Sequence, residues 1–154
     1  MNKAYILIDT SVMLEILDVP GKAHDHGTIM NEFKEKADAD CSFFIPLATI
    51  LETGNHIAQN GDGRQRLDSA IKFVKLIEKS IEGESPFKVL KFFDQGELRN
   101  WLQEFPESAK RKESFGDLSI RKDLDRLHEL KPREDIFIWT LDGHLDAYSI
   151  KGER

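Results

Sequence analysis

The stretch Tyr5-Ile6-Leu7-Ile8-Asp9-Thr10-Ser11 decides the fold of this chain. Residues 5–8 form an unbroken apolar run of β-favouring side chains, the pattern of a strand buried on both faces. The next three residues are of the types that begin helices, and the apolar residues at 12–17 keep helical spacing. The stretch therefore predicts a buried strand that turns directly into a helix.

Similar apolar runs, separated by helical patterns, recur along the rest of the chain. We expect strands at residues 42–45, 87–93 and 136–140, and a short terminal strand after 148. We expect helices at residues 28–37, 47–59, 64–81, 95–105 and 117–130, a loop or short turn at 107–114, and one helical turn within 142–148. Strands without polar alternation, separated by helices, indicate a three-layer α/β/α fold around a central, mostly parallel sheet of four to five strands.

Length and composition fit one ordinary domain spanning residues 1–154. Apolar residues make up 40% of the chain and charged residues 32%, which is typical of a globular protein. The single cysteine, Cys41, excludes an intramolecular disulfide framework and a cysteine zinc site. The early apolar run at 4–8 is too short for a signal peptide or a membrane span. We therefore expect a cytoplasmic protein with no membrane partner.

The charge balance does not by itself indicate a nucleic-acid-binding protein. The chain has 22 basic and 28 acidic residues, a formal net charge of −6, and a pI of about 5.4. Residues 110–133 are locally basic, with eight Lys and Arg residues against five acids. This segment predicts a rim for RNA phosphates, or else a solvated helix face. The candidate RNA-binding residues are Lys110, Arg111, Lys112, Arg121 and Lys122.

Acidic residues lie where a parallel sheet places its functional site. Such sheets form their sites outside the carboxyl ends of the strands. Asp9 ends the first predicted strand and Asp142 follows the last long one. Glu52 lies on the helix after the second strand, and Asp117 begins a helix after Gly116. These four acids are the first candidates for a site.

Each of the four acids also has an ordinary structural explanation when taken alone. Asp9 and Asp117 suit the first turn of a helix, as caps or as partners of the helix dipole. Asp142 precedes a glycine, as in tight turns, and Glu52 lies off the apolar stripe of its helix. No single acid decides between the two interpretations, since only a fold can bring them together.

Taken in order, the motifs resemble those of the PIN-domain ribonucleases. They are Tyr5 to Ser11, Ile45-Pro46-Leu47 through Glu52, Phe115-Gly116-Asp117, and Trp139-Thr140-Leu141-Asp142. The resemblance covers nearly the whole chain and implies a PIN-like, Rossmann-like fold. The segment 60–114 departs from it, because it is long for compact members of the family.

The resemblance also implies a site and an activity. Asp9, Glu52, Asp117 and Asp142 match the acidic quartet that holds Mg²⁺ or Mn²⁺. Neighbouring residues match supporting positions: Thr10, Ser11 and Thr140 for hydroxyls, and Asp146 for a further acid. The implied activity is a metal-dependent endoribonuclease that leaves a 5′-phosphate and a 3′-hydroxyl. The implied biology is the toxin of a toxin–antitoxin pair, similar to VapC-type proteins, with a homodimer and a small antitoxin as partners.

The chemistry of clustered carboxylates agrees with this interpretation. Carboxylates about 4 Å apart repel by roughly 1 kcal/mol in water and about 4 kcal/mol at a protein edge. A divalent cation relieves that repulsion, and an all-oxygen acidic set suits Mg²⁺ or Mn²⁺ rather than zinc. We expect Asp9, Asp117 and Asp142 as ligands and Glu52 as a ligand directly or through water, with nearby hydroxyls orienting them.

Other α/β proteins with acidic strand ends fit the sequence less well. A receiver domain needs an acidic pair after the first strand, and a haloacid-dehalogenase phosphatase needs Asp-x-Asp, whereas Thr10 and Ser11 follow Asp9. A phosphate-binding P-loop motif is absent from the sequence. The remaining alternative is a PIN-like fold without catalysis that binds RNA or a protein.

Overall fold

The structure is a computed structural model that describes residues 1–153, with residue 146 described by its backbone only. The strands are β1 (Tyr5–Ile8), β2 (Ser42–Ile45), β3 (Phe87–Val89), β4 (Ile136–Trp139) and β5 (Ser149–Ile150). The helices are α1 (Thr10–Ile16), α2 (His26–Asp38), α3 (Leu47–Ala58), α4 (Gly63–Ile81), α5 (Gln95–Lys110), α6 (Phe115–Leu130) and α7 (Gly143–Asp146). Among these described helices, none is both long and apolar enough to cross a membrane.

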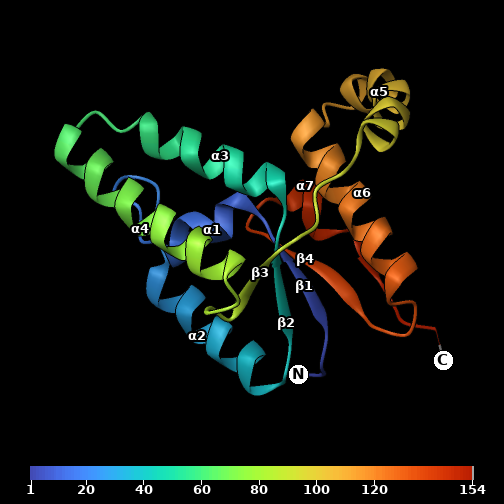
Figure 1. The fold of residues 1–154 in the computed structure, drawn as a ribbon, viewed down its shortest axis with the longest axis horizontal. Coiled ribbons are helices and arrows are strands. Elements are labelled where there is room, and N and C mark those ends of the chain that lie inside the picture. The colour runs from blue at the N-terminus through green and yellow to red at the C-terminus, as the bar shows by residue number, and fades with distance from the viewer. Residues whose placement is uncertain (154) are drawn as a thin grey trace.

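The sheet has the strand order β3-β2-β1-β4-β5, with β1 at its centre. β1 pairs in parallel with β2 and with β4, and β2 pairs in parallel with β3. Only β5 is antiparallel to its neighbour, β4. The predicted α/β fold with a mostly parallel sheet between helical layers is therefore confirmed. In Figure 1, α1 to α4 lie on one side of the sheet and α5 and α6 on the other.

β1 is buried on both faces because its side chains enter two separate apolar cores. Ile6 and Ile8 pack in the core that the sheet forms with α1 and α2. Leu7 points into the other core, against Ile120 and Leu124 of α6. This two-sided burial explains why the run at 5–8 shows no polar alternation.

The prediction of a strand over 87–93 was too long. β3 ends at Val89, and its last ladder bond runs from the Leu90 N–H to the Ile45 carbonyl, at 3.0 Å. In the described sheet β3 is an edge strand beside β2, and β2 ends at Ile45. The chain turns there into α3, which begins at Leu47, so residues 91–92 have no described strand beside them and leave the sheet exposed.

The prediction that the helix of residues 95–105 ends before Pro106 was wrong. α5 continues through Pro106 to Lys110. Because Pro106 has no N–H, the carbonyl of Leu102, one turn earlier, lacks its helical hydrogen-bond donor. Both residues are exposed, so water can replace the lost hydrogen bond. A T-shaped contact between the rings of Phe105 and Phe115, 5.1 Å apart, holds this last part of α5 against α6.

A buried hydrogen bond fixes α3 to the end of β1. The hydroxyl of Thr49, in the first turn of α3, donates to the Ile8 carbonyl at 2.7 Å, and Thr49 is fully buried. The helix that carries Glu52 therefore begins directly beside the strand that ends in Asp9.

We predict that Thr49→Val lowers the free energy of unfolding by about 1–2 kcal/mol, because the isosteric change leaves a buried carbonyl without this donor. Urea unfolding measures the change. Thr28→Val, at an exposed position of α2, is the matched control and should stay within about 0.5 kcal/mol of the wild type. Equal effects of the two substitutions would contradict this role of Thr49.

Candidate active site

Asp9 lies at the N-cap position of α1, but its carboxylate does not cap the helix. In the described chain it has no cap hydrogen bond. The Oδ2 atom instead accepts hydrogen bonds from Ser11 Oγ at 2.9 Å and from Thr140 Oγ1 at 2.7 Å. Asp9 is only 5% exposed. The capping explanation of Asp9 therefore fails, and its carboxylate is held toward the end of β4.

The hydroxyls around Asp9 connect the ends of two neighbouring strands. Ser11 Oγ accepts from the Leu141 N–H, and Thr140 Oγ1 accepts from the Asp142 N–H, each at 2.9 Å. Each hydroxyl uses its proton on Asp9 and its lone pairs on the 141–142 backbone. The loop that carries Asp142 is thereby fixed next to Asp9.

Glu52 points from the second turn of α3 toward the same edge. Its Oε2 atom accepts a hydrogen bond from Thr10 Oγ1 at 3.1 Å. Its Oε1 atom occupies the space that a side chain at Gly116 would need, because a Cβ built there overlaps it. The glycine thus permits the start of α6 to approach Glu52 closely.

Asp117 lies in the first turn of α6, whose cap is Ser114. The Asp117 N–H donates to Ser114 Oγ at 3.1 Å, so Ser114 performs the capping role. Burial, followed by the negative charges of Asp9, Asp142, Glu52 and Glu113, raises the pKa of Asp117 to about 6. The other three predicted acids therefore lie close enough to oppose the ionisation of Asp117.

Asp142 has both a structural role and a place among the candidate acids. Asp142 caps α7, because its Oδ1 atom accepts from the His144 N–H at 2.9 Å. This is the ordinary explanation of an acid at this position, yet the charge of Asp142 also acts on Asp117. The side chain of Asp146 lies outside the described part of the structure.

The donor chemistry of this edge suits a hard divalent cation. The four carboxylates supply oxygen ligands, and Asp117 meets three like charges, a repulsion that Mg²⁺ or Mn²⁺ would offset. The carboxylates are not yet gathered around one point: in residues 1–153, the side chain of 146 aside, no three acidic, histidine or cysteine groups form a metal site. Hydroxyls engage one oxygen each of Asp9 and Glu52, so the second oxygen of each carboxylate would be the one to bind an ion.

Two of the five predicted RNA-binding residues are engaged in ion pairs. Arg121 donates two hydrogen bonds to Glu113, from Nε to Oε2 at 3.2 Å and from Nη2 to Oε1 at 3.0 Å. Burial favours the neutral form of Glu113, but hydrogen bonds from Arg121 and Ser108 and the charges of Arg121 and Arg111 outweigh it and lower the pKa of Glu113. Lys122 pairs with Glu104 at 2.5 Å. The other three predicted RNA-binding residues, Lys110, Arg111 and Lys112, are exposed.

Sequence reasoning missed several residues that shape this edge. A Ser-x-x-Asp cap pattern at 114–117 could have identified Ser114 as the cap. The space that Gly116 leaves for Glu52 depends on packing between two helices far apart in the chain, which no local pattern shows. His144 and Tyr148 line a cavity beside Asp117, and neither had a recognisable motif.

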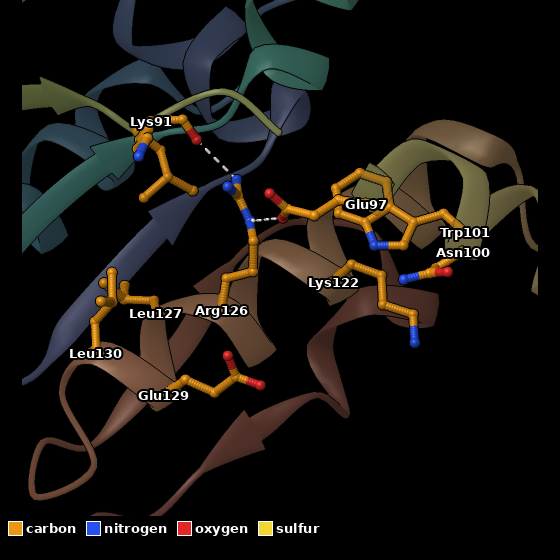
Figure 2. A pocket seen from close by; sticks show the side chains of 10 residues that line it. Lys91, Glu97, Asn100, Trp101, Lys122, Arg126, Leu127, Glu129 and Leu130 are labelled. Carbon is orange, nitrogen blue, oxygen red and sulfur yellow. Dashed lines mark hydrogen bonds and ion pairs between the residues drawn. The ribbon is translucent and has the colours of Figure 1, made fainter. Parts of the chain in front are cut away.

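A separate hollow lies between α5, α6 and the segment after β3, away from the acids (Figure 2). It has a volume of about 420 Å³, and its described lining contains none of the four acids. Arg126 crosses it, donating to the Lys91 carbonyl at 2.7 Å and pairing with Glu97 at 3.3 Å, as Figure 2 shows. Arg126 also pairs with buried Asp123. These bonds tie the segment after β3 to α5 and α6, which is a structural role.

The raised pKa of Asp117 predicts how the stability of the metal-free protein depends on pH. Between the ordinary value of 3.8 and about 6, the folded protein binds this proton more tightly than the unfolded chain. Stability therefore falls as pH rises through that window. We predict that Asp117→Asn raises the Tm at pH 7.5 without divalent ions, and that this gain disappears near pH 4.

The Tm difference between variant and wild type, measured from pH 4 to 8 with a chelator, tests this. The pKa of Asp123 is also raised to about 6, mainly by burial. Because Asp123 is present in both proteins, its contribution to the pH dependence cancels in the Tm difference. Asp125→Asn, on the exposed face of the same helix, is the control. A gain for Asp117→Asn that is flat with pH would refute the assignment.

Comparison with known proteins adds support for the fold. No family model and no curated protein sequence matches the chain. Among solved structures, the chain is similar to the crystal structure of FitAcB from Neisseria gonorrhoeae, with a TM-score of 0.53 and 14% sequence identity. The match covers 89% of this chain and 87% of that chain. At this identity the likeness concerns the fold alone, and it supports the PIN-like architecture.

Proposed function

We propose that this protein is a metal-dependent endoribonuclease that uses the acidic edge of its sheet. One observation carries the proposal: the carboxyl group of Asp117 lies among the charges of Asp9, Glu52 and Asp142, which together with burial raise its pKa to about 6. Strongly perturbed carboxyl groups gathered at the carboxyl ends of parallel strands are typical of functional sites.

The cluster of like charges does not stabilise the fold, but it can supply ligands for a cation. Unlike Glu113, which Arg121 neutralises, Asp117 has three further acids among the charges that act on it. A domain that needed only stability would gain from an uncharged residue there. A site for a hard cation needs these charges, since they supply its ligands.

Each residue has a role in this proposal. Asp9, Asp117 and Asp142 would hold Mg²⁺ or Mn²⁺, with Glu52 contacting it directly or through water. When bound, the ion supplies an activated water and neutralises charge on the scissile phosphate. Ser11 and Thr140 hold the Asp9 carboxylate in one orientation, and Thr10 does the same for Glu52. Orientation of ligands by such neighbours strengthens metal binding.

The biological part of the proposal follows the resemblance of the motifs. It is the toxin of a toxin–antitoxin pair in the cytoplasm, with RNA as substrate and a small antitoxin and a second copy of the chain as partners. The expected products carry a 5′-phosphate and a 3′-hydroxyl. The competing function is a PIN-like module that binds RNA or protein without cleaving it.

We predict that Asp9→Asn lowers Mn²⁺-dependent cleavage of single-stranded RNA by more than ~100-fold, since a charged ligand is replaced by a neutral amide. The Tm in metal-free buffer should be unchanged or higher, because the variant removes one of the like charges around Asp117. Gel analysis of a labelled RNA measures cleavage.

Asp18→Asn is the matched control. Asp18 is exposed, and its positive φ of 52° suits asparagine equally well, so cleavage should be unchanged. Cleavage that survives both Asp9→Asn and a chelator would reject the mechanism. RNA binding by the wild type without cleavage in Mg²⁺ or Mn²⁺ would favour the binding module.

A further inference from the structure

A small cavity lies directly beside the acidic edge. It has a volume of about 160 Å³, below the roughly 300–1,000 Å³ of pockets that enclose whole small molecules. Seven residues line it: Arg111, Lys112, Glu113, Asp117, His144, Leu145 and Tyr148. Because Asp117 belongs to both the cavity and the acidic edge, a group in the cavity would lie next to the reacting phosphate.

The positive charges of this cavity are available to a ligand. Arg121 engages both carboxylate oxygens of Glu113, so Glu113 is neutralised by a residue outside the cavity lining. Arg111 and Lys112 are exposed, and neither forms a direct ion pair with a described residue, although the charge of Arg111 also acts on Glu113. The cavity thus offers two cations outside direct ion pairs, whereas Lys110 does not line it and Lys122 is paired with Glu104.

The backbone of Lys112 fixes its position at the cavity. The Lys112 N–H donates to the Ala109 carbonyl at 3.0 Å, and the Glu113 N–H donates to the Ser108 carbonyl at 2.9 Å. These two bonds end α5 in a Schellman motif, in which Lys112 has a φ of 65°. Glycine is the favoured residue at this position, so Lys112 adopts a backbone conformation that glycine would adopt more easily.

An RNA strand that crosses the acidic edge would need positive groups close to its phosphates. Its phosphates are repelled by the acidic edge, and a strand can cross that edge only if neighbouring phosphates are held by positive groups. Arg and Lys are the usual hydrogen-bond donors to phosphate groups. The cavity, at about 160 Å³, suits a small group such as a phosphate better than a whole small molecule.

We propose that Arg111 and Lys112 form a phosphate subsite that holds the RNA strand next to the scissile bond, in the cavity that His144 and Tyr148 also line. This inference rests on the proposed nuclease function. It selects two of the candidate basic residues and assigns them to one phosphate group next to Asp117.

Lys112→Gly tests the proposal without damage to the fold, because glycine suits the positive φ at least as well as lysine. The expected results are a Tm equal to or above that of the wild type, a KM for single-stranded RNA raised about 5–10-fold, and a kcat within about twofold. The slope of log(kcat/KM) against log salt should fall by about 0.7, the loss of one phosphate contact on a single strand. Arg111→Gln should give the same changes.

Lys75→Gln, at an exposed position of α4, is the charge-matched control and should leave KM and the salt slope unchanged. A wild-type KM and salt slope in both cavity variants would overturn the subsite, and so would equal effects of Lys75→Gln. These outcomes require a wild type that cleaves RNA in Mn²⁺. A wild type that does not cleave rejects the proposed function instead, so the two failures are distinguishable.

Discussion

The hydrogen bonds from Ser11 and Thr140 to Asp9 are the interaction on which this structure most depends. Thr140 lies at the end of β4, and Ser11 in turn accepts from the Leu141 N–H, so these bonds join the end of β1 to the end of β4, which pairs with β1 in parallel. A carboxylate that is 5% exposed would be costly to bury without such partners. The same bonds use one oxygen of Asp9, so its second oxygen is left for a cation at the edge where the charges of Asp9 and Asp142 act on Asp117. Fold stability and site geometry therefore share one set of contacts at this point.

The rest of the edge works in the opposite sense, because it concentrates charge instead of neutralising it. Asp117 ionises against its neighbours, so its pKa is raised, whereas nearby Glu113 has Arg121 as a partner and its pKa is lowered. Two acids four residues apart thus have opposite environments. The Glu113–Arg121 pair links the segment between α5 and α6 to α6, whereas Asp117 lies among the acids of the candidate metal site. Functional sites commonly store such unfavourable interactions, and the surrounding contacts hold them in place.

Local sequence patterns predicted the sheet and most helices because each strand is an apolar run and each helix has a regular stripe. They failed where a distant partner decides the outcome. β3 stops early because its partner β2 ends at Ile45 and the chain turns into α3, and α5 passes through Pro106 at an exposed position where water can replace the lost bond. The candidate acids could be selected from strand ends and from motif resemblance. The space at Gly116 and the cavity at Lys112 could not, since both arise from contacts between α6 and other elements.

The central claim is that distant acids form one cation site at the carboxyl edge of the sheet. A crystal structure of the wild-type protein soaked with Mn²⁺, with an anomalous difference map, tests it most directly. The account predicts one or more strong peaks within coordination distance of carboxylate oxygens from Asp9, Asp117 and Asp142. A protein saturated with Mn²⁺ that shows no peak among these residues, or a peak only elsewhere on the molecule, would contradict it.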